Sequence, residues 1–303
     1  MDSIRVLVSL ITKDNDYQRE QAVAAERAAA KLGMRAEIIY AASDAITQSQ
    51  QLLEAIQAQP EKRPEAIMLE PAGTGLQQVA AAAAKANIAW VILNREVDYI
   101  RDVQRTTTVP VFAVSSDHLE IGRMQGRQCQ QLLPEGGQVL YVQGPSTSYA
   151  AQQRTQGMME SKPHNINVRV LSGQWTEASA HQAAISLMRL RTSRESRVDL
   201  VCGQNDLMAL GVRKALKEVM PEWSWVPFTG VDGMVATGQR WVQEGILAAT
   251  IVVPTNTDIA LEMLNQALVS KSQPKELTLV KPKSYPELEK LTPKNKQTSL
   301  QPV

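Results

Sequence analysis

The sequence predicts an α/β protein with two doubly wound, Rossmann-like parallel sheets. Three observations support this prediction. Short apolar segments alternate with helical segments, the alternation pauses once and then resumes, and the chain has 303 residues. Alternation of this kind is typical of βαβ units, in which helices connect parallel strands. A length of 303 residues is enough for two domains, since a domain takes roughly 100–200 residues.

The first run of alternation starts at the N-terminus. An apolar segment predicts the first strand, and an Ala-, Glu- and Arg-rich helix follows it and stops at Gly33. Asp44 is predicted to cap the second helix, because its carboxylate can accept a hydrogen bond from the first helical turn. The predicted strands are residues 4–11, 36–40, 66–70, 89–93 and 111–114, and the predicted helices are residues 17–32, 44–57 and 76–85.

The alternation pauses at residues 94–109, a polar and Thr-rich segment that we interpret as a surface excursion between sheet elements. From Pro274 onward the chain is rich in Lys, Pro and Gln, and we expect residues 294–303 to be disordered. Between these two segments we predict strands at residues 138–142, 168–171, 200–202, 226–231 and 248–253, and helices at residues 117–133, 149–160, 176–190, 206–219 and 234–243.

Composition and charge argue against several classes of protein. Lys and Arg total 32 and Asp and Glu total 31, so the net charge of +1 gives no bulk attraction for nucleic acid or an anionic membrane. The two cysteines and three histidines lack zinc-ligand spacing, so no metal site is predicted. The sequence leaves open whether Cys129 and Cys202 pair. No apolar run approaches the ~18 residues of a membrane span.

The motifs of doubly wound enzymes are also missing. The sequence contains no GxGxxG, no GxxxxGK[ST] and no GxSxG. We therefore predict a protein that is not an enzyme and has no cofactor, with a doubly wound enzyme as the less favoured alternative.

Polar and aromatic residues follow many of the predicted strands in both halves of the chain. Doubly wound sheets bind ligands beyond the carboxyl ends of their strands, so with two sheets the expected site is the cleft between the domains. We expect Asp206 to cap the helix that begins at Leu207 rather than to bind a ligand. The candidate ligand-binding residues at strand ends are Asn15, Tyr17, Gln18, Asn94, Arg95, Gln152, Trp175, Asn205 and Asp232.

These residue types suit a small, neutral, polyhydroxylated ligand. Amides and charged groups form directional hydrogen bonds with hydroxyl groups, and aromatic rings cover the apolar face of a sugar ring.

Three segments carry a resemblance to a known family. Residues 204–211 read QNDLMALG, residues 231–233 read VDG and residues 247–251 read LAATI. Together they resemble the type I periplasmic sugar-binding proteins of the ribose/galactose-binding group, which are related to the ligand-binding domains of lactose-repressor-type regulators. Asn15-Asp16-Tyr17-Gln18, Leu93-Asn94-Arg95 and the segment starting at Arg154 resemble further segments of that family, in the expected order along nearly the whole chain.

The resemblance implies roles for single residues. Asn15, Tyr17, Asn94 and Arg95 would bind the sugar from the first domain, and Trp175, Asn205 and Asp232 from the second. The chain also departs from the family pattern: Asn94 replaces an aspartate, Gln152 an arginine, Gln18 an aromatic residue, and Val253 a glutamine that often closes the site. These changes remove a charge and at least one hydrogen bond.

The resemblance further implies two lobes joined by three crossing segments. The first lobe would comprise residues 1–116 and 254–276, and the second residues 117–253 and 277–293. The lobes would close on the ligand by hinge bending, and a monomeric binding protein would deliver the ligand to the permease of an ABC transporter.

Two matters stay open at this stage. A ligand-sensing domain of a signalling system is the alternative function, with a sensor protein as its partner and without a DNA-binding segment. The N-terminus shows no signal peptide. The protein is periplasmic if Met1 replaces a removed leader, and cytoplasmic if Met1 is the natural start.

Overall fold

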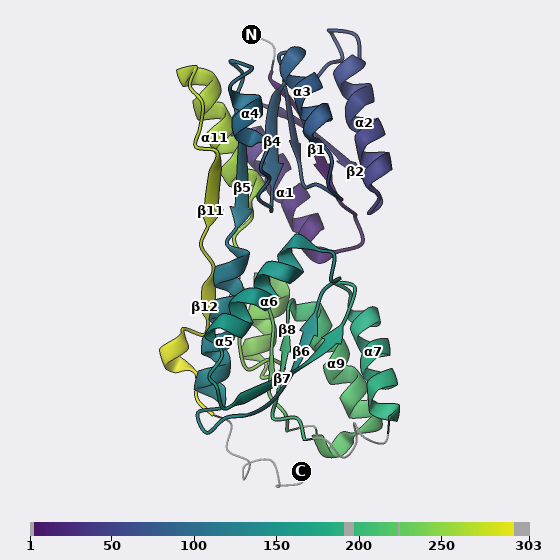
Figure 1. Ribbon diagram of the computed structural model, residues 1–303, viewed down its shortest axis with the longest axis vertical. Coiled ribbons are helices and arrows are strands. Elements are labelled where there is room, and N and C mark those ends of the chain that lie inside the picture. The colour runs from purple at the N-terminus through teal and green to yellow at the C-terminus, as the bar shows by residue number, and fades with distance from the viewer. Residues whose placement is uncertain (1–2, 191–196, 224, 294–303) are drawn as a thin grey trace. The chain divides into compact units, whose positions relative to one another are not determined.

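The structure is a computed structural model that describes residues 3–190, 197–223 and 225–293. The chain divides into two compact units (Figure 1). The first unit consists of Met1–Ser116 and Thr255–Val280, and the second of Asp117–Pro254 and Lys281–Val303. Residues 294–303, which we expected to be disordered, lie outside the described residues.

The first unit contains a parallel sheet of six strands in the order β11-β5-β4-β3-β1-β2. The edge strand β11 (Leu277–Val280) pairs with β5, with Leu277 opposite Ala113. It therefore belongs to the first unit and not to the second, where the sequence analysis placed residues 277–293. The other strands are β1 (Arg5–Leu10), β2 (Arg35–Tyr40), β3 (Ala66–Leu69), β4 (Ala89–Leu93) and β5 (Val111–Ser116).

Helices cover both faces of this sheet, which is why its strands read as nearly continuous apolar runs. Val6, Val8 and Leu10 lie in one core with α1 (Asp16–Lys31) and α11 (Thr257–Ser270). Leu7, on the opposite face, lies in the other core with α2 (Ala45–Gln57), α3 (Gln77–Lys85) and α4 (Ile100–Gln104).

Local signals set the helix boundaries much as predicted. The Asp44 carboxylate accepts a hydrogen bond from the backbone N–H of Thr47 at 2.9 Å and caps α2. The interpretation of residues 94–109 as a surface excursion is only partly right, since α4 lies within them. Ile100 and Val103 are buried against the sheet because they occupy one face of this short helix.

The second unit contains a parallel sheet in the order β7-β6-β8-β9. Its strands are β6 (Gly137–Gln143), β7 (Ile166–Ser172), β8 (Leu200–Gly203) and β9 (Phe228–Thr229). One core contains α5 (His118–Leu132) and α6 (Tyr149–Ser161), and the other contains α7 (Glu177–Arg189) and α9 (Asp206–Val219).

The end of the second unit differs most from the prediction. The strand expected at residues 226–231 is only the two-residue β9, and that expected at 248–253 is β10 (Thr250–Val252). β10 pairs antiparallel with β12 (Lys283–Tyr285), which the sequence did not reveal because none of its three residues is buried. The helix expected at residues 234–243 is a π-helix, η2 (Val235–Gln239), followed by α10 (Arg240–Gln243).

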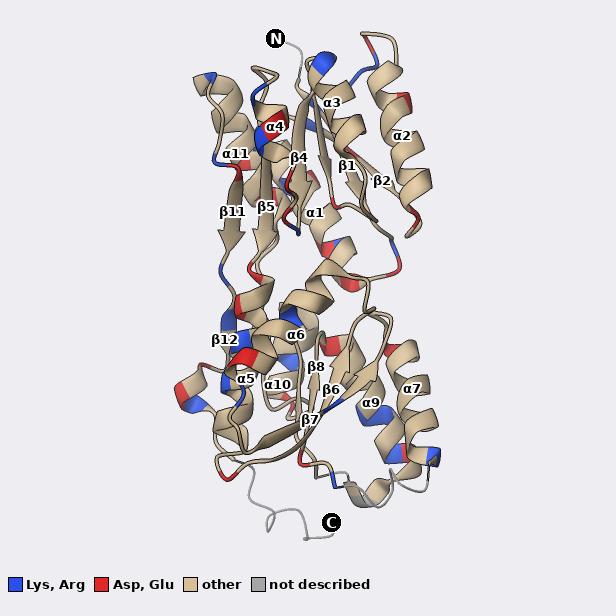
Figure 2. Ribbon diagram, in the orientation of Figure 1, with Lys and Arg blue, Asp and Glu red and all other residues tan. Residues whose placement is uncertain are grey.

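The two cysteines lie together in the core between the sheet and α5. Both are free thiols and both are fully buried. A hydrogen bond with Cys202, together with burial, raises the pKa of the Cys129 thiol. Charged residues of both signs are interspersed along each unit rather than gathered by sign (Figure 2).

Helices α5 and α6 approach so closely that their facing positions require glycine. A Cβ on Gly157 would lie 2.0 Å from the Leu119 carbonyl oxygen, and one on Gly122 would lie 2.0 Å from that of Arg154. Both atoms belong to backbone, which cannot rotate away.

Gly157→Ala should therefore destabilise the protein by about 1–3 kcal/mol, the usual cost of overpacking. The same change in an exposed helix interior would stabilise by about 1 kcal/mol. Urea denaturation measures the difference, with Gln156→Ala on the exposed side of α6 as the control. A stability equal to or above that of the wild type would show that α5 and α6 do not make this contact.

Candidate ligand-binding site

The strand order reverses once in each sheet, between β1 and β3 in the first unit and between β6 and β8 in the second. Such switch points are where doubly wound sheets bind ligands, because the connecting loops diverge there to opposite faces. The candidate residues follow the strands on either side of these points, and each unit carries its own group of them.

In the first unit, a buried carboxylate joins two of the candidate amides. Gln18 Nε2 donates to Glu70 Oε2 at 2.7 Å, and Asn94 Nδ2 donates to Glu70 Oε1 at 2.9 Å. Gln18 follows β1, Glu70 follows β3 and Asn94 follows β4, so three neighbouring strand ends meet in this network. Glu70 was not among the predicted site residues.

Asn256, at the start of α11, joins the same network from the other end of the chain. Its side chain is 1% exposed. Its Nδ2 lies within hydrogen-bond distance of Tyr17 Oη at 3.0 Å, Ser116 Oγ at 3.2 Å and Asn94 Oδ1 at 3.3 Å. Gln21 holds its backbone, since Gln21 Oε1 accepts from Asn256 N at 3.0 Å.

The remaining candidates of the first unit lie beside this network. Asn15 caps α1, because its Oδ1 accepts from the backbone N–H of Gln18 at 3.3 Å. Arg95 is half-buried and donates from Nη1 to the Gly73 carbonyl oxygen at 2.9 Å. These contacts fix both side chains near the ends of β1 and β4.

In the second unit, the central group is Arg154 on α6, a residue that is 5% exposed. Its guanidinium donates to the carbonyl oxygen of Gln204, and its Nε lies 3.4 Å from His118 Nδ1. Nη1 lies 3.9 Å from Asp232 Oδ1, and Cζ lies 5.6 Å from the centre of the Trp175 ring. Arg154 thus brings together Asp232 and Trp175, two residues predicted from the sequence.

Both the oxygen and the nitrogen of the Asn205 side-chain amide form hydrogen bonds that hold this site together. Its Oδ1 accepts from the Met208 backbone N–H at 2.8 Å and caps α9, and its Nδ2 donates to the Trp175 carbonyl oxygen at 3.0 Å. The Trp175 ring sits against Gly144, where a Cβ would lie 2.3 Å from the ring. A glycine after β6 is therefore required for the position of the indole.

The expectation that Asp206 caps the following helix is wrong, because Asn205 holds that position. Asp206 is buried instead, and it accepts from Thr250 Oγ1 at 2.6 Å and from the Gly233 backbone N–H at 2.9 Å. Burial, and after it the charge of Asp232, raises the pKa of Asp206 well above its ordinary value.

Two predicted residues take less part in this arrangement. Gln152 is exposed, and its Nε2 donates to the Ser146 carbonyl oxygen of its own loop at 2.8 Å. Val253 is buried and contributes its backbone, with its N–H donating to the Asp232 carbonyl oxygen at 3.1 Å.

Three of the predicted residues have a strained backbone. Asn94, Trp175 and Asp232 have φ angles of 60°, 64° and 96°. Positive φ is unfavourable for residues with a Cβ, above all for a bulky one. Strain of this kind concentrates at functional sites, which agrees with the placement of these three residues at strand ends.

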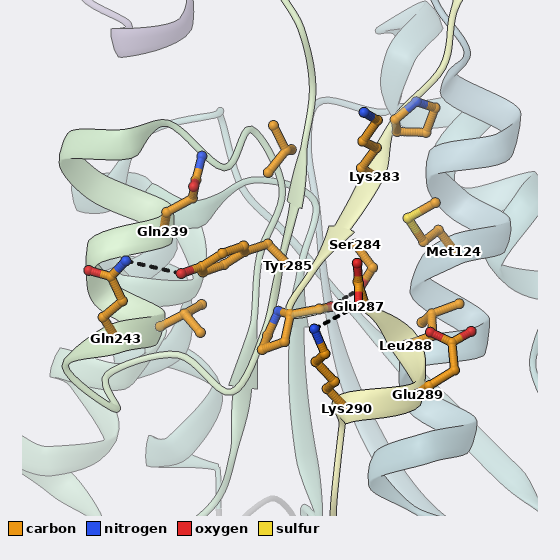
Figure 3. Close-up of a pocket in the computed structure, with 14 residues that line it drawn as sticks. Met124, Gln239, Gln243, Lys283, Ser284, Tyr285, Glu287, Leu288, Glu289 and Lys290 are labelled. Carbon is orange, nitrogen blue, oxygen red and sulfur yellow. Dashed lines mark hydrogen bonds and ion pairs between the residues drawn. The ribbon is translucent and has the colours of Figure 1, made fainter.

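A surface groove of about 1080 Å³ lies elsewhere on the second unit. It is bordered by β12, α5 and α10, and Gln243 donates to Tyr285 Oη within it at 3.0 Å (Figure 3). None of the ten predicted site residues lines it.

Two further properties concern the described part of the chain alone. No helix there is long and apolar enough to cross a membrane. No group of three or more His, Cys, Asp or Glu side chains there could hold a metal ion.

Comparison with known proteins places the chain in a family. A model of the periplasmic binding protein domain matches residues 6–272, so the chain belongs to the periplasmic binding protein domain family. This finding confirms the resemblance seen in the sequence.

Individual relatives agree with this assignment. The ribose import binding protein RbsB of Salmonella typhimurium is 29% identical over 186 residues, 59% of this chain and 61% of that protein. The match thus spans less than two thirds of this relative's length.

The solved structures show the same fold. A galactofuranose binding protein has a TM-score of 0.80 at 20% identity, covering 95% of this chain and 98% of that one. A solute binding protein of an ABC transporter from Actinobacillus succinogenes with bound D-allose has a TM-score of 0.80 at 17% identity, covering 93% and 97%.

Sequence reasoning missed Glu70, Asp206 and Asn256 as members of the site, and it noted Arg154 after a strand without giving it a ligand-binding role. Two of them carried a usable signal. Glu70 is a charged residue that ends an apolar strand and precedes Pro71, and Arg154 stands in a segment that resembles the family. Asn256 carried no such signal, since its partners are far away in the sequence.

Asp206→Asn should change how stability depends on pH. Because the pKa of Asp206 is raised in the folded state, the folded protein binds more protons than the unfolded one, and stability falls as pH rises from about 4 through the raised pKa. The asparagine oxygen can still accept from the Gly233 backbone N–H, and its amide nitrogen can donate to Thr250 Oγ1 in place of the bond that the carboxylate accepts, so both contacts remain without the charge. The melting temperature of the variant should therefore increase relative to that of the wild type as pH rises.

A control with the opposite sign is Asp44→Asn. Hydrogen bonds from Thr47 lower the pKa of the exposed Asp44, so its contribution is lost as pH falls. If plots of melting temperature against pH for the wild type and Asp206→Asn run parallel from pH 4 to 8, the raised pKa of the buried Asp206 is contradicted.

Asn256→Ala should destabilise the first unit, because Tyr17, Asn94 and Ser116 would each lose a buried amide partner. The expected loss is about 1–3 kcal/mol, measured by urea denaturation. Asn265→Ala, on the same helix and half-exposed, is the control and should be close to neutral. Equal stabilities of the two variants would show that the Asn256 network contributes nothing.

Proposed function

We propose that this chain is a solute-binding protein that captures a small, neutral, polyhydroxylated ligand of the sugar type. The observation that carries the proposal is the group formed by Arg154, Asp232 and Trp175 at the switch point of the second unit. A guanidinium donates hydrogen bonds to ligand oxygens, a carboxylate accepts them from hydroxyl groups, and an indole covers the apolar face of a sugar ring.

The charges at the two switch points support a neutral ligand. The first unit offers Glu70 and Arg95, and the second offers Asp232 and Arg154. Each unit thus presents a carboxylate and a guanidinium beside several amides, and the second unit also holds the buried carboxyl group of Asp206. An ionic ligand would leave one of these charges without compensation, which is costly where water is excluded.

The proposal extends to how the ligand is held and delivered. The chain passes between the units three times, after Ser116, Pro254 and Val280, and we propose that these segments act as a hinge on which both units close around one ligand. The protein would work as a monomer in the cell envelope, without catalysis, and pass its ligand to the permease of an ABC transporter. The similarity to an import binding protein and to a solute binding protein of an ABC transporter supports this assignment.

A thermal-shift screen with D-ribose, D-allose, D-galactose and myo-inositol tests the proposal. A ligand at one hundred times its dissociation constant stabilises the folded state by about 2.7 kcal/mol and raises the melting temperature. Calorimetry should then show that Asp232→Ala weakens binding of the active sugar at least about tenfold, because a charged hydrogen-bond acceptor is lost.

The matched control is Asp102→Ala, an exposed carboxylate on α4, which should bind like the wild type. The proposal would be wrong if no neutral polyol or sugar shifts the melting temperature. If Asp232→Ala retained full affinity, the assignment of Asp232 to the ligand-binding site would be wrong.

A further inference from the structure

Glu70 occupies the most central position of the first unit's candidate site. It follows β3, which lies between β1 and β4, and the strand order reverses between β1 and β3. Its carboxylate therefore stands at the switch point itself, where a doubly wound sheet meets its ligand.

The Glu70 side chain is held in place from several sides. It is 8% exposed. Its backbone N–H donates to the Ser9 carbonyl oxygen at 2.9 Å, and its own carbonyl oxygen accepts from Gln48 Nε2 at 2.9 Å. Because Gln18 and Asn94 also donate to its two carboxylate oxygens, the carboxylate is fixed before any ligand arrives.

The same bonds fix which way the two amides face. Gln18 Oε1 accepts from the Ile11 backbone N–H at 2.9 Å, and Asn94 Oδ1 lies 3.3 Å from Asn256 Nδ2. Both amide oxygens are therefore turned toward protein donors, and both amide nitrogens toward Glu70. Among Gln18, Asn94 and Glu70, the acceptor that can be offered to a ligand hydroxyl is thus the carboxylate. Since a carboxylate can accept about four hydrogen bonds, it can hold two amides and ligand hydroxyls together.

We propose that Glu70 is a specificity-determining residue of the first unit, which binds hydroxyl groups of the ligand and discriminates against anionic ligands. This inference rests on the proposed function and adds a residue and a substrate class to it. A buried negative charge repels a carboxylate or phosphate on the ligand, so neutral sugars are selected over sugar acids.

The test compares a neutral sugar with its acid, using D-ribose with D-ribonate and D-galactose with D-galacturonate. Calorimetry measures both members of each pair on the wild type and on Glu70→Gln. We expect Glu70→Gln to bind the neutral member at least about tenfold more weakly, and the preference for the neutral member over the acid to fall by about tenfold or more.

Glu65→Gln is the matched control, because Glu65 precedes the same strand at its opposite end and pairs with Arg5. It should keep both the affinity and the preference of the wild type. Glu70→Asp, which keeps the charge on a shorter side chain, should lose affinity and retain the preference. It tests the proposal independently if Glu70→Gln does not fold.

The outcomes separate this inference from the proposed function. If Glu70→Gln keeps the affinity and the preference of the wild type, the role of Glu70 alone is overturned. The same holds if the variant's affinities for the neutral sugar and for its acid fall equally. Loss of the preference in Glu70→Asp also overturns it. If the wild type binds neither neutral sugar nor acid, the proposed function fails and the role of Glu70 fails with it.

Discussion

The buried guanidinium of Arg154 is the group on which the second unit's site depends. A cation that is 5% exposed is tolerated only where hydrogen bonds and an opposite charge replace its water. The carbonyl oxygen of Gln204 and the carboxylate of Asp232 meet this need, and the Trp175 ring lies beside it. The positions of these residues are therefore mutually determined, and Asp206 lies close enough to Asp232 for their charges to interact.

The first unit satisfies the same constraint with the opposite sign. There the buried group is the Glu70 carboxylate, and amides rather than a guanidinium surround it. Each sheet thus places a buried charged residue, Glu70 or Arg154, near its switch point, and groups at the ends of adjacent strands compensate its charge. Both arrangements are preorganised, which lowers the cost of ordering side chains when a ligand binds.

Much of the fold could be predicted because its main strands are buried on both faces. Residues such as Val8 and Leu7 then appear together as a continuous apolar run, and polar residues mark where each strand ends. β12 escaped prediction because an exposed residue such as Lys283 leaves no apolar run. The candidate residues could be located from the sequence because they follow predicted strands. The hydrogen bonds among them could not be predicted, since partners such as Asn256 and Tyr17 are separated by most of the chain.

The placement of α11 and β11 has a consequence for how the protein is made. Both elements belong to the first unit, yet they follow the main segment of the second unit along the chain. During synthesis the core around Val6, Val8 and Leu10 stays open on the side that Leu261 and Leu264 later cover. The sheet also keeps β5 as an unpaired edge until β11 emerges. The part of the molecule that is synthesised first therefore cannot be completed until the main segment of the second unit has been made. Until then its apolar face and free strand edge are exposed to association with other chains.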